Sequence, residues 1–285
     1  DINHMRSEKQ TLEFTKMEAC GNDYIYVNCF NQKIDNPEGL SIRFADRHFG
    51  IGGDGVVLMY PSDVADVKMR MFNLDGTEGR MCGNAARCIA KYLIDNGIVN
   101  RDYVTIETLS GIRKVAVEKV NGVVSYATVD MGRAELNPAM IPVKLTGDTA
   151  IGVPTKVADG RYRITCVSMG NPHCVVFSED LDSPLDYLDL EKLGPKFEND
   201  PLFPERVNTE FIKVLNPKTL KMRVWERGSG ETWACGSGAC AAVVAAVENG
   251  YCPKNEDITV KLKGGDLRIR YTDDAVYLSG GCVKI

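Results

Sequence analysis

The sequence predicts an α/β (α+β) protein of two pseudo-symmetric domains, each a curved, mostly antiparallel sheet wrapped around a central buried helix. Three observations predict this duplicated fold. One Cys-Gly motif occurs twice among matching landmarks, short β-rich runs are numerous, and the two convincing helices each end at an Asn-Gly pair.

The repeat is visible in the order and spacing of the landmarks. Cys82-Gly83 and Cys235-Gly236 are each followed by small residues, with a Glu four residues before the cysteine and Asn-Gly 14 residues after it. Upstream, Gly21-Asn22 lies 60 residues before Cys82, and Gly170-Asn171 lies 64 residues before Cys235. The joint spacing indicates a duplicated unit.

The domain boundaries follow from this repeat. We predict one domain from 12–131 together with 275–285, because the final run reads as a strand that returns to the first domain, and a second domain from 132–274. We interpret residues 1–11 as an expression remnant and a disordered start, and their polar character predicts no signal peptide.

Strands are predicted where β-branched and aromatic residues gather. The predicted strands are Tyr24–Phe30, Val56–Tyr60, Val67–Asn73, Tyr103–Thr108, Arg113–Glu118, Val123–Asp130, Tyr162–Ser168, Val207–Val214, Met222–Glu226, Ile258–Lys263 and Leu267–Tyr271. The predicted helices are Asn84–Asn96 and Ser237–Asn249, each stopped by Gly, and a third at Asp189–Asn199 that Gly194-Pro195 breaks. The second helix is apolar all round, which predicts that it is buried.

Composition excludes several functional classes. With 39 acidic and 34 basic residues, the chain has no electrostatic reason to bind nucleic acid or an anionic membrane. No apolar run is long enough to span a bilayer. We therefore expect a cytoplasmic protein with a small-molecule substrate.

Ten cysteines leave two structural alternatives open, a disulfide framework and a metal site. A chain of 285 residues without a secretory signal has little need of disulfides. The sequence has no Cys-x-x-Cys pair and three histidines, so we predict no metal. Most of the cysteines are expected to pack as small apolar residues.

Two of the cysteines, Cys82 and Cys235, are predicted to be catalytic because each begins a buried helix. Free N–H groups at a helix start bind anions and lower the pKa of a thiol. If two such starts face each other, a substrate carboxylate between them has its α-carbon between a thiolate and a thiol. One sulfur then removes the α-proton and the other protonates the opposite face, which inverts the centre without a cofactor.

Residues around the second helix start extend this prediction. Glu226 and Arg227 end a predicted strand and would hold an ammonium group and a carboxylate, although a surface ion pair is the alternative. His173 is placed to tune the nearby thiol, or is simply structural. We interpret Gly50–Gly55 as a turn before a strand.

The motifs together resemble the diaminopimelate epimerase family. They extend over nearly the whole chain from about Phe14. The carrying motifs are Lys16-Met17 with Gly21-Asn22-Asp23, Asp46 to Gly52, Phe72-Asn73 through Cys82-Gly83-Asn84, Met169 to His173, Val207-Asn208, and Glu226-Arg227-Gly228 through Cys235-Gly236-Ser237-Gly238.

The resemblance implies an isomerase that interconverts LL- and meso-diaminopimelate for lysine and peptidoglycan synthesis, without pyridoxal phosphate or any other cofactor and as a cytoplasmic homodimer. It assigns the two bases to Cys82 and Cys235, with His173 near the thiols. The reacting end would be held by Asn22, Gly83, Asn84, Gly236, Ser237 and Glu226. The distal L-centre would be held by Asn73, Asn171, Asn208 and Arg227.

Three alternatives stay open at this point. A related cofactor-independent racemase could act on histidine, glutamate or proline, although the distal set argues against it. A cofactorless isomerase that has lost the cysteine pair is disfavoured because both cysteines are present. A thiol or metal-binding protein without activity would leave the matched helix starts unexplained. The chain also has Glu18-Ala19 where family members commonly have His-Gly, and Gly55 where some have Gln.

Overall fold

The computed structural model describes residues 11–285, so the interpretation of residues 1–10 lies outside the described residues. The strands are β1 Thr15–Ala19, β2 Asn22–Asn28, β3 Gly55–Tyr60, β4 Val67–Asn73, β5 Glu78–Gly79, β6 Tyr103–Thr108, β7 Gly111–Val120, β8 Val123–Asp130, β9 Val153–Val157, β10 Gly160–Ser168, β11 Pro172–Phe177, β12 Asn208–Asn216, β13 Thr219–Glu226, β14 Gly230–Glu231, β15 Asp257–Leu262, β16 Gly265–Tyr271, β17 Val276–Gly281 and β18 Val283–Lys284. The helices are α1 Pro37–Phe44, α2 Gly83–Asp95, α3 Leu190–Glu198 and α4 Gly236–Glu248, with 3₁₀ helices η1 Ser178–Asp180 and η2 Leu185–Tyr187.

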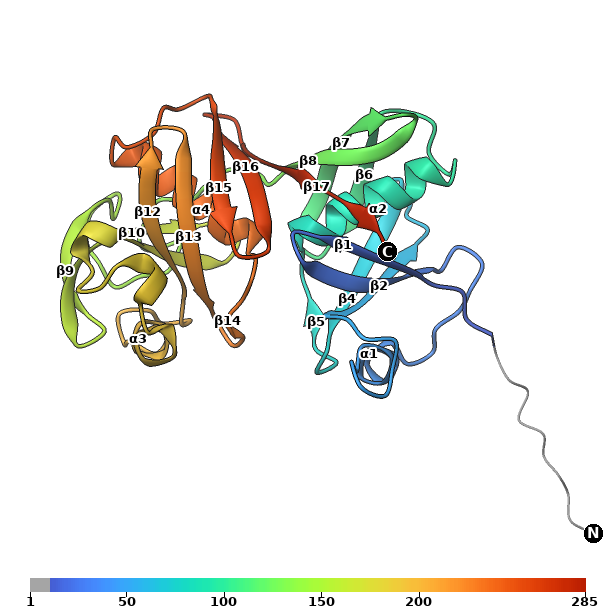
Figure 1. Ribbon diagram of the computed structural model, residues 1–285, viewed down its shortest axis with the longest axis horizontal. Coiled ribbons are helices and arrows are strands. Elements are labelled where there is room, and N and C mark those ends of the chain that lie inside the picture. The colour runs from blue at the N-terminus through green and yellow to red at the C-terminus, as the bar shows by residue number, and fades with distance from the viewer. Residues whose placement is uncertain (1–10) are drawn as a thin grey trace, which may run out of the picture.

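Two lobes of similar architecture lie side by side (Figure 1). In the first, β2 pairs in parallel with β3, β4 is antiparallel to β3 and parallel to β6, and β6, β7 and β8 follow as an antiparallel meander. In the second, β11, β12, β13, β15, β16 and β17 repeat the same pairings in the same order. The predicted duplication and mostly antiparallel sheets are confirmed.

An ion pair recurs with the repeat. Arg70 on β4 contacts Glu78 on β5 at 2.9 Å, and Arg223 on β13 contacts Glu231 on β14 at 2.8 Å. The two glutamates are the ones that precede Cys82 and Cys235 by four residues. Each pair holds the connection that leads from the sheet to a central helix.

The lobes join through β8 and β17, which hold equivalent places in the two repeats. The two strands pair antiparallel, with Leu278 opposite Val129 and Ser279 opposite Thr128, whose hydroxyl oxygens lie 2.7 Å apart. After β17 the chain enters the first lobe, where β18 pairs with β1, the place that β9 has beside β10. The boundaries at 12–131 with 275–285 and at 132–274 stay a prediction; the pairings put β18 in the first lobe and make β17 the counterpart of β8 in the second.

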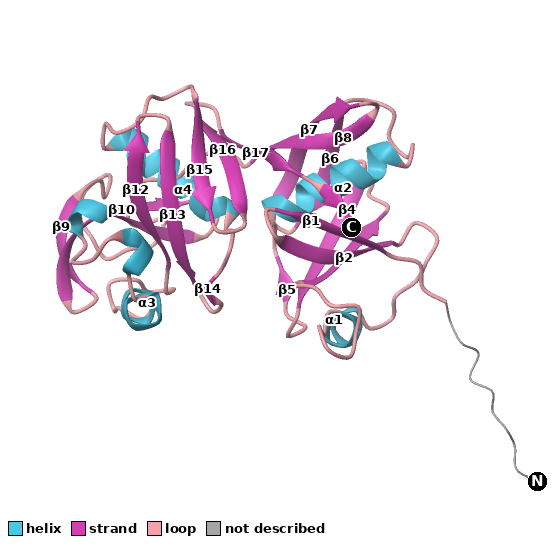
Figure 2. Cartoon of the chain, in the orientation of Figure 1, coloured by secondary structure: helices cyan, strands magenta, loops and turns pink. Residues whose placement is uncertain are grey.

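The central helices α2 and α4 pack against the sheets of their own lobes (Figure 2). Both begin one residue earlier than predicted, at the glycine, so that Cys82 and Cys235 are the N-cap residues. Gly97 and Gly250 follow the helix ends with positive φ, as the C-terminal stop signals predict. Every residue from Gly238 to Ala246 is buried, which confirms the prediction for the apolar helix.

The predicted break in the third helix is wrong, because α3 continues through Gly194-Pro195. The proline removes one helical N–H. Burial of Leu190 and Phe197 outweighs that loss, and Asp189 caps the helix start. Gly194 is required for packing, since a Cβ there would lie 2.2 Å from a ring carbon of Trp225. The sequence did not predict α1 or the strands β1, β5, β9 and β14. Within residues 11–285 no helix is long and apolar enough to span a membrane.

Candidate active site

The first part of the site surrounds Cys82 at the start of α2. Asp54 accepts a hydrogen bond from the side-chain amide nitrogen of Asn22 at 2.6 Å. Because a carboxylate only accepts, this bond turns the Asn22 carbonyl oxygen toward α2. That oxygen accepts from the thiol of Cys82 at 3.4 Å and from the amide of Asn84 at 3.3 Å. Four side chains from three segments thus fix the environment of one sulfur.

The second part surrounds Cys235 at the start of α4. The Gly238 N–H donates to its sulfur at 3.3 Å, and the hydroxyl of Ser237 lies 3.7 Å from the sulfur. The Asn171 amide nitrogen donates to Ser237 at 3.3 Å, and the Asn171 carbonyl oxygen lies 2.9 Å from His173 Nε2. The turn before β11 is therefore connected to the second helix start.

A buried acid completes the network behind His173. Glu210 on β12 lies 2.6 Å from His173 Nδ1, and both side chains are fully buried. Burial raises the pKa of Glu210 to about 7, with His173 acting in the opposite direction. The Glu210 Oε2 atom has no hydrogen-bond partner within residues 11–285.

Glu226 affects the pKa of both thiols. It ends β13, and Thr232 donates a hydrogen bond to it. Burial raises the pKa of Glu226, and its charge in turn raises the pKa of both Cys82 and Cys235. The predicted surface-pair alternative for Glu226 and Arg227 therefore does not describe Glu226, which is held inside the site.

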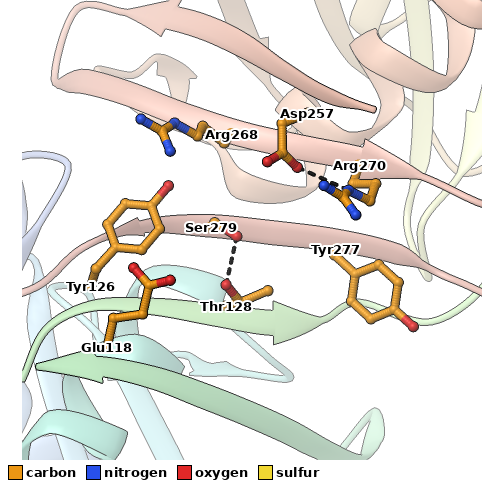
Figure 3. A pocket seen from close by; sticks show the side chains of 8 residues that line it. All are labelled: Glu118, Tyr126, Thr128, Asp257, Arg268, Arg270, Tyr277 and Ser279. Atoms are coloured by element: carbon orange, nitrogen blue, oxygen red, sulfur yellow. Dashed lines mark hydrogen bonds and ion pairs between the residues drawn. The ribbon is translucent and has the colours of Figure 1, made fainter. Parts of the chain in front are cut away.

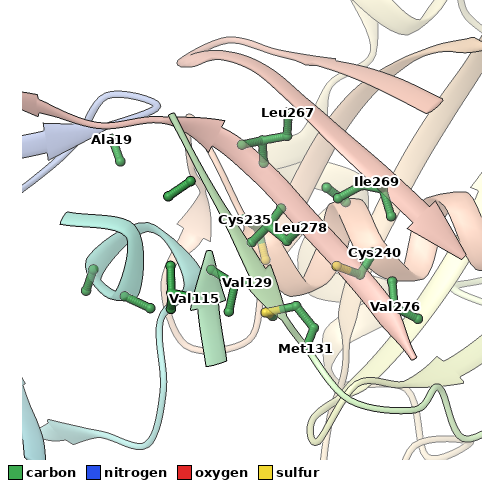
Figure 4. Packing of buried hydrophobic residues seen from close by; sticks show 14 of the residues in the cluster. Ala19, Val115, Val129, Met131, Cys235, Cys240, Leu267, Ile269, Val276 and Leu278 are labelled. Atoms are coloured by element: carbon green, nitrogen blue, oxygen red, sulfur yellow. The ribbon is translucent and has the colours of Figure 1, made fainter. Parts of the chain in front are cut away.

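The two helix starts meet over one side chain of the β8–β17 seam. A Cβ on Gly83 would lie 2.4 Å from Leu278 Cδ2, and a Cβ on Gly236 would lie 3.1 Å from the same carbon. Figure 4 shows Leu278 beside Cys235 in this core. The starts of α2 and α4 are therefore neighbours, and the glycine after each cysteine is what allows the approach.

The helix starts act on the thiol pKa values in the expected direction, but the net shift of each is upward. Burial raises the pKa of Cys82 and raises that of Cys235 further. The helix N–H groups act in the opposite direction but do not outweigh the loss of solvation. Both cysteines are free thiols in the structure.

The residues predicted to hold a distal group form a looser set. Asn208 donates to the Pro172 carbonyl at 3.0 Å and accepts from the Arg227 backbone N–H at 2.8 Å, so it joins β11 to the end of β13. The Arg227 guanidinium donates to the Glu205 carbonyl at 3.0 Å. Asn73 at the end of β4 donates to Thr77 at 3.1 Å. No hydrogen bond of the described chain links Asn73 to the other three.

Sequence reasoning missed Asp54, Glu210 and Thr232. Asp54 stood in the segment Gly50–Gly55, which does form a turn before β3 but also orients Asn22. Glu210 carried a signal, as the one carboxyl in the predicted strand Val207–Val214. Glu18, which departs from the family pattern, caps its own turn by accepting from the Gly21 N–H at 2.9 Å.

A depression of about 280 Å³ lies elsewhere, on the opposite face of the seam, and Figure 3 shows its lining. Its polar residues come from β7, β8, β15, β16 and β17 and include Arg268, Tyr126 and Tyr277. None of the predicted site residues lines it. Across residues 11–285 no three His, Cys, Asp or Glu side chains are grouped so that they could hold a metal ion.

Comparison with known proteins finds a matching family model and several similar sequences. The family model described as diaminopimelate epimerase matches residues 14–137 and 165–285. Proteins named diaminopimelate epimerase from Desulfovibrio desulfuricans and Acetivibrio thermocellus are 51% and 49% identical to the chain, and each match covers 96% of both sequences. A relative of the same name from Methanococcus maripaludis is 48% identical over 96% of this chain and 98% of its own length.

Solved structures share the fold at lower identity. A probable proline racemase from Agrobacterium radiobacter has a TM-score of 0.69 at 14% identity, covering 96% of this chain and 91% of that one. A hydroxyproline epimerase from Agrobacterium vitis has a TM-score of 0.67 at 14% identity, covering 96% and 89%. These likenesses concern the fold alone.

The raised pKa of Glu210 predicts a pH-dependent stability difference between the wild type and Glu210→Gln. The unfolded carboxyl loses its proton near the ordinary value of 4.5, whereas the folded one keeps it up to about 7. The native state binds more protons between these values, so the wild type loses stability relative to the neutral variant as pH rises, by on the order of 1–3 kcal/mol.

Urea unfolding of both proteins at a series of pH values measures this difference. Glu205→Gln is the matched control, because Glu205 is exposed on the segment before β12, and its difference from the wild type should stay flat. A Glu210→Gln difference that is constant, or that grows in favour of the wild type as pH rises, would contradict the assignment.

Proposed function

Since this chain belongs to the diaminopimelate epimerase family and is an isomerase, we propose that it interconverts LL- and meso-diaminopimelate with Cys82 and Cys235 as acid and base. The reaction is a step of lysine biosynthesis. One observation carries the proposal: the two N-cap cysteines begin matched buried helices that pack on the same carbon of Leu278.

In the proposed reaction one cysteine, as thiolate, removes the α-proton from one face of the substrate. The electron pair of the broken C–H bond stays on the α-carbon and is delocalised into the neighbouring carboxylate. The other cysteine, as thiol, donates its proton to the opposite face, so the centre is inverted and the two sulfurs exchange their protonation states. The carbanion is the difficult species, because an α-proton is a very weak acid.

The helix starts supply the stabilisation that the carbanion needs. N–H groups of Gly83, Asn84, Gly236 and Ser237 belong to the first turns of α2 and α4, where no carbonyl within the helix satisfies them. A carboxylate between the two starts would accept these bonds and lie at the positive ends of two helix dipoles. Glu226, within reach of both thiols, would hold the ammonium group on the same α-carbon.

His173 supports the second cysteine through a chain of contacts. It binds Asn171, Asn171 binds Ser237, and Ser237 lies beside Cys235. Glu210 orients the imidazole from behind. In this proposal His173 acts by holding Ser237 in place and by contributing to the field at Cys235.

Recognition of the distal L-centre is proposed for Asn73, Asn171, Asn208 and Arg227. Asn208 and Arg227 are already connected through the backbone of Arg227, and Asn171 lies beside Pro172, which Asn208 contacts. A second amino-acid head group would use these polar side chains. A substrate without it would leave them unpaired, which is how such sites discriminate strongly.

We further propose that the chain works as a homodimer in the cytoplasm, as the family resemblance implies. Sedimentation velocity of the full chain should then show a species of twice the chain mass of 31.4 kDa. A monomer at micromolar concentration would contradict the dimer and would leave the chemistry of the site untouched.

The two-cysteine mechanism predicts exchange of the substrate α-proton with solvent. Proton NMR in heavy water should show the α-proton signal of LL-diaminopimelate disappearing with the reduced wild type. Cys82→Ala and Cys235→Ala should each lower the rate by on the order of 10²–10⁴-fold, because each loses an acid or base. Cys252→Ala, which removes a buried thiol outside this network, is the control. Undiminished exchange in either site variant would overturn the mechanism.

The distal set predicts which amino acids exchange. In the same assay, 2-aminopimelate lacks only the distal amino group and should lose roughly 10⁴-fold in kcat/KM. Proline, histidine and glutamate should show no exchange. Preferential exchange of any of these three would support the alternative function, a related racemase that shares the two-base mechanism but not the substrate.

A further inference from the structure

Helix α2 contains a fully buried arginine one turn beyond Cys82. Arg87 is 0% exposed, and its Nη2 donates to the side-chain oxygen of Asn84 at 2.8 Å. Its Nε donates to the Gly281 carbonyl at 3.3 Å. Its Nη1 is buried without an acceptor in residues 11–285, and no ion pair joins Arg87 to a carboxylate in that part of the chain. Burying a cation without a counter-charge costs free energy, so we expect Arg87 to have a role that compensates for this cost.

The acidic groups that face Arg87 are weak ones. They are the thiols of Cys20, Cys82, Cys88, Cys240 and Cys282 and the phenol of Tyr126, and Arg87 lowers the pKa of each. Among these, Cys82 combines partial exposure with a helix start and a bound asparagine oxygen. Cys82 is therefore the group best placed to become the anion that balances the positive charge of Arg87.

The second lobe does not repeat this arrangement. The position that matches Arg87, five residues after Cys235, is the neutral Cys240. Cys235 instead faces two buried carboxyls, Glu226 and Glu210, and both raise its pKa. Of the two, Glu226 also acts on Cys82, as does Arg87 with the opposite sign. The fold is symmetric at the two sulfurs but the charge around them is not.

We propose that Arg87 is a positioning residue that makes Cys82 the thiolate and Cys235 the thiol of the resting protein. Its guanidinium supplies the positive charge behind Cys82. Its bond to the Asn84 oxygen also turns the Asn84 amide nitrogen toward Asn22, which fixes the oxygen that the Cys82 sulfur contacts. The proposal rests on the two-cysteine site of the proposed function and adds which cysteine acts first as base.

Alkylation of each cysteine by iodoacetamide, followed by mass spectrometry across a range of pH, tests the assignment without substrate. A thiolate reacts and a thiol does not, so the pH of half-maximal rate reports each sulfur independently of its exposure. In the wild type, Cys82 should have a lower midpoint than Cys235. Arg87→Met should raise the Cys82 midpoint by about one unit and leave that of Cys235 in place. Arg87→Lys, which keeps the charge, should restore most of the wild-type midpoint.

Lys91→Met is the matched control, because Lys91 is a buried cation one turn further along α2 that has a carboxylate partner, Asp95, at 2.8 Å. It should leave the Cys82 midpoint unchanged. A lower midpoint at Cys235 than at Cys82 in the wild type overturns the proposal, and so does an equal shift in Arg87→Met and Lys91→Met. If Arg87→Met does not fold, the proposal is still tested by the order of the Cys82 and Cys235 midpoints in the wild type and by the Cys82 midpoint of Arg87→Lys. If the wild type exchanges no substrate α-proton with solvent, that result contradicts the proposed function and not the assignment of the thiolate.

Discussion

The antiparallel pairing of β8 with β17 is the contact on which the geometry of the site depends. The two strands are equivalent in the repeat, so pairing them relates the lobes by an approximate twofold axis. Leu278 on β17 then packs under the starts of both central helices. Two cysteines that are 153 positions apart in the chain come to the same place because the strand beside their helices is shared.

The site combines two opposing electrostatic effects. Helix starts favour anions, yet the same helices are buried, and burial disfavours a charged sulfur. In the unliganded protein burial has the larger effect and raises the pKa of both thiols, that of Cys235 further than that of Cys82. The duplicated backbone provides equal dipoles on both sides. Side chains that are not duplicated distinguish the two cysteines, because Arg87 lowers the pKa of Cys82 and Glu210 raises that of Cys235, whereas Glu226 raises both.

Much of the fold could be predicted from the sequence, because the signals for strands and helix ends lie within short stretches of neighbouring residues. Strands such as Val67–Asn73 and Val123–Asp130 were predicted with their observed bounds, and both central helices were displaced by one residue at each end. The misses involve partners that are distant in the chain. Gly194-Pro195 looked like a helix break because its packing against Trp225 is invisible in the local sequence. Asp54 and Glu210 were missed for the same reason, since Asn22 and His173 lie 32 and 37 residues away.

The return of the chain into the first lobe has a consequence for how the protein is made. β17 pairs with the outer edge of β8, and β18 pairs with the free edge of β1, yet both strands follow the rest of the second lobe in the chain and are made after it. Throughout synthesis of the second lobe, the first lobe therefore has two open edges able to pair with other chains. Its sheet is completed last, although its residues are made first.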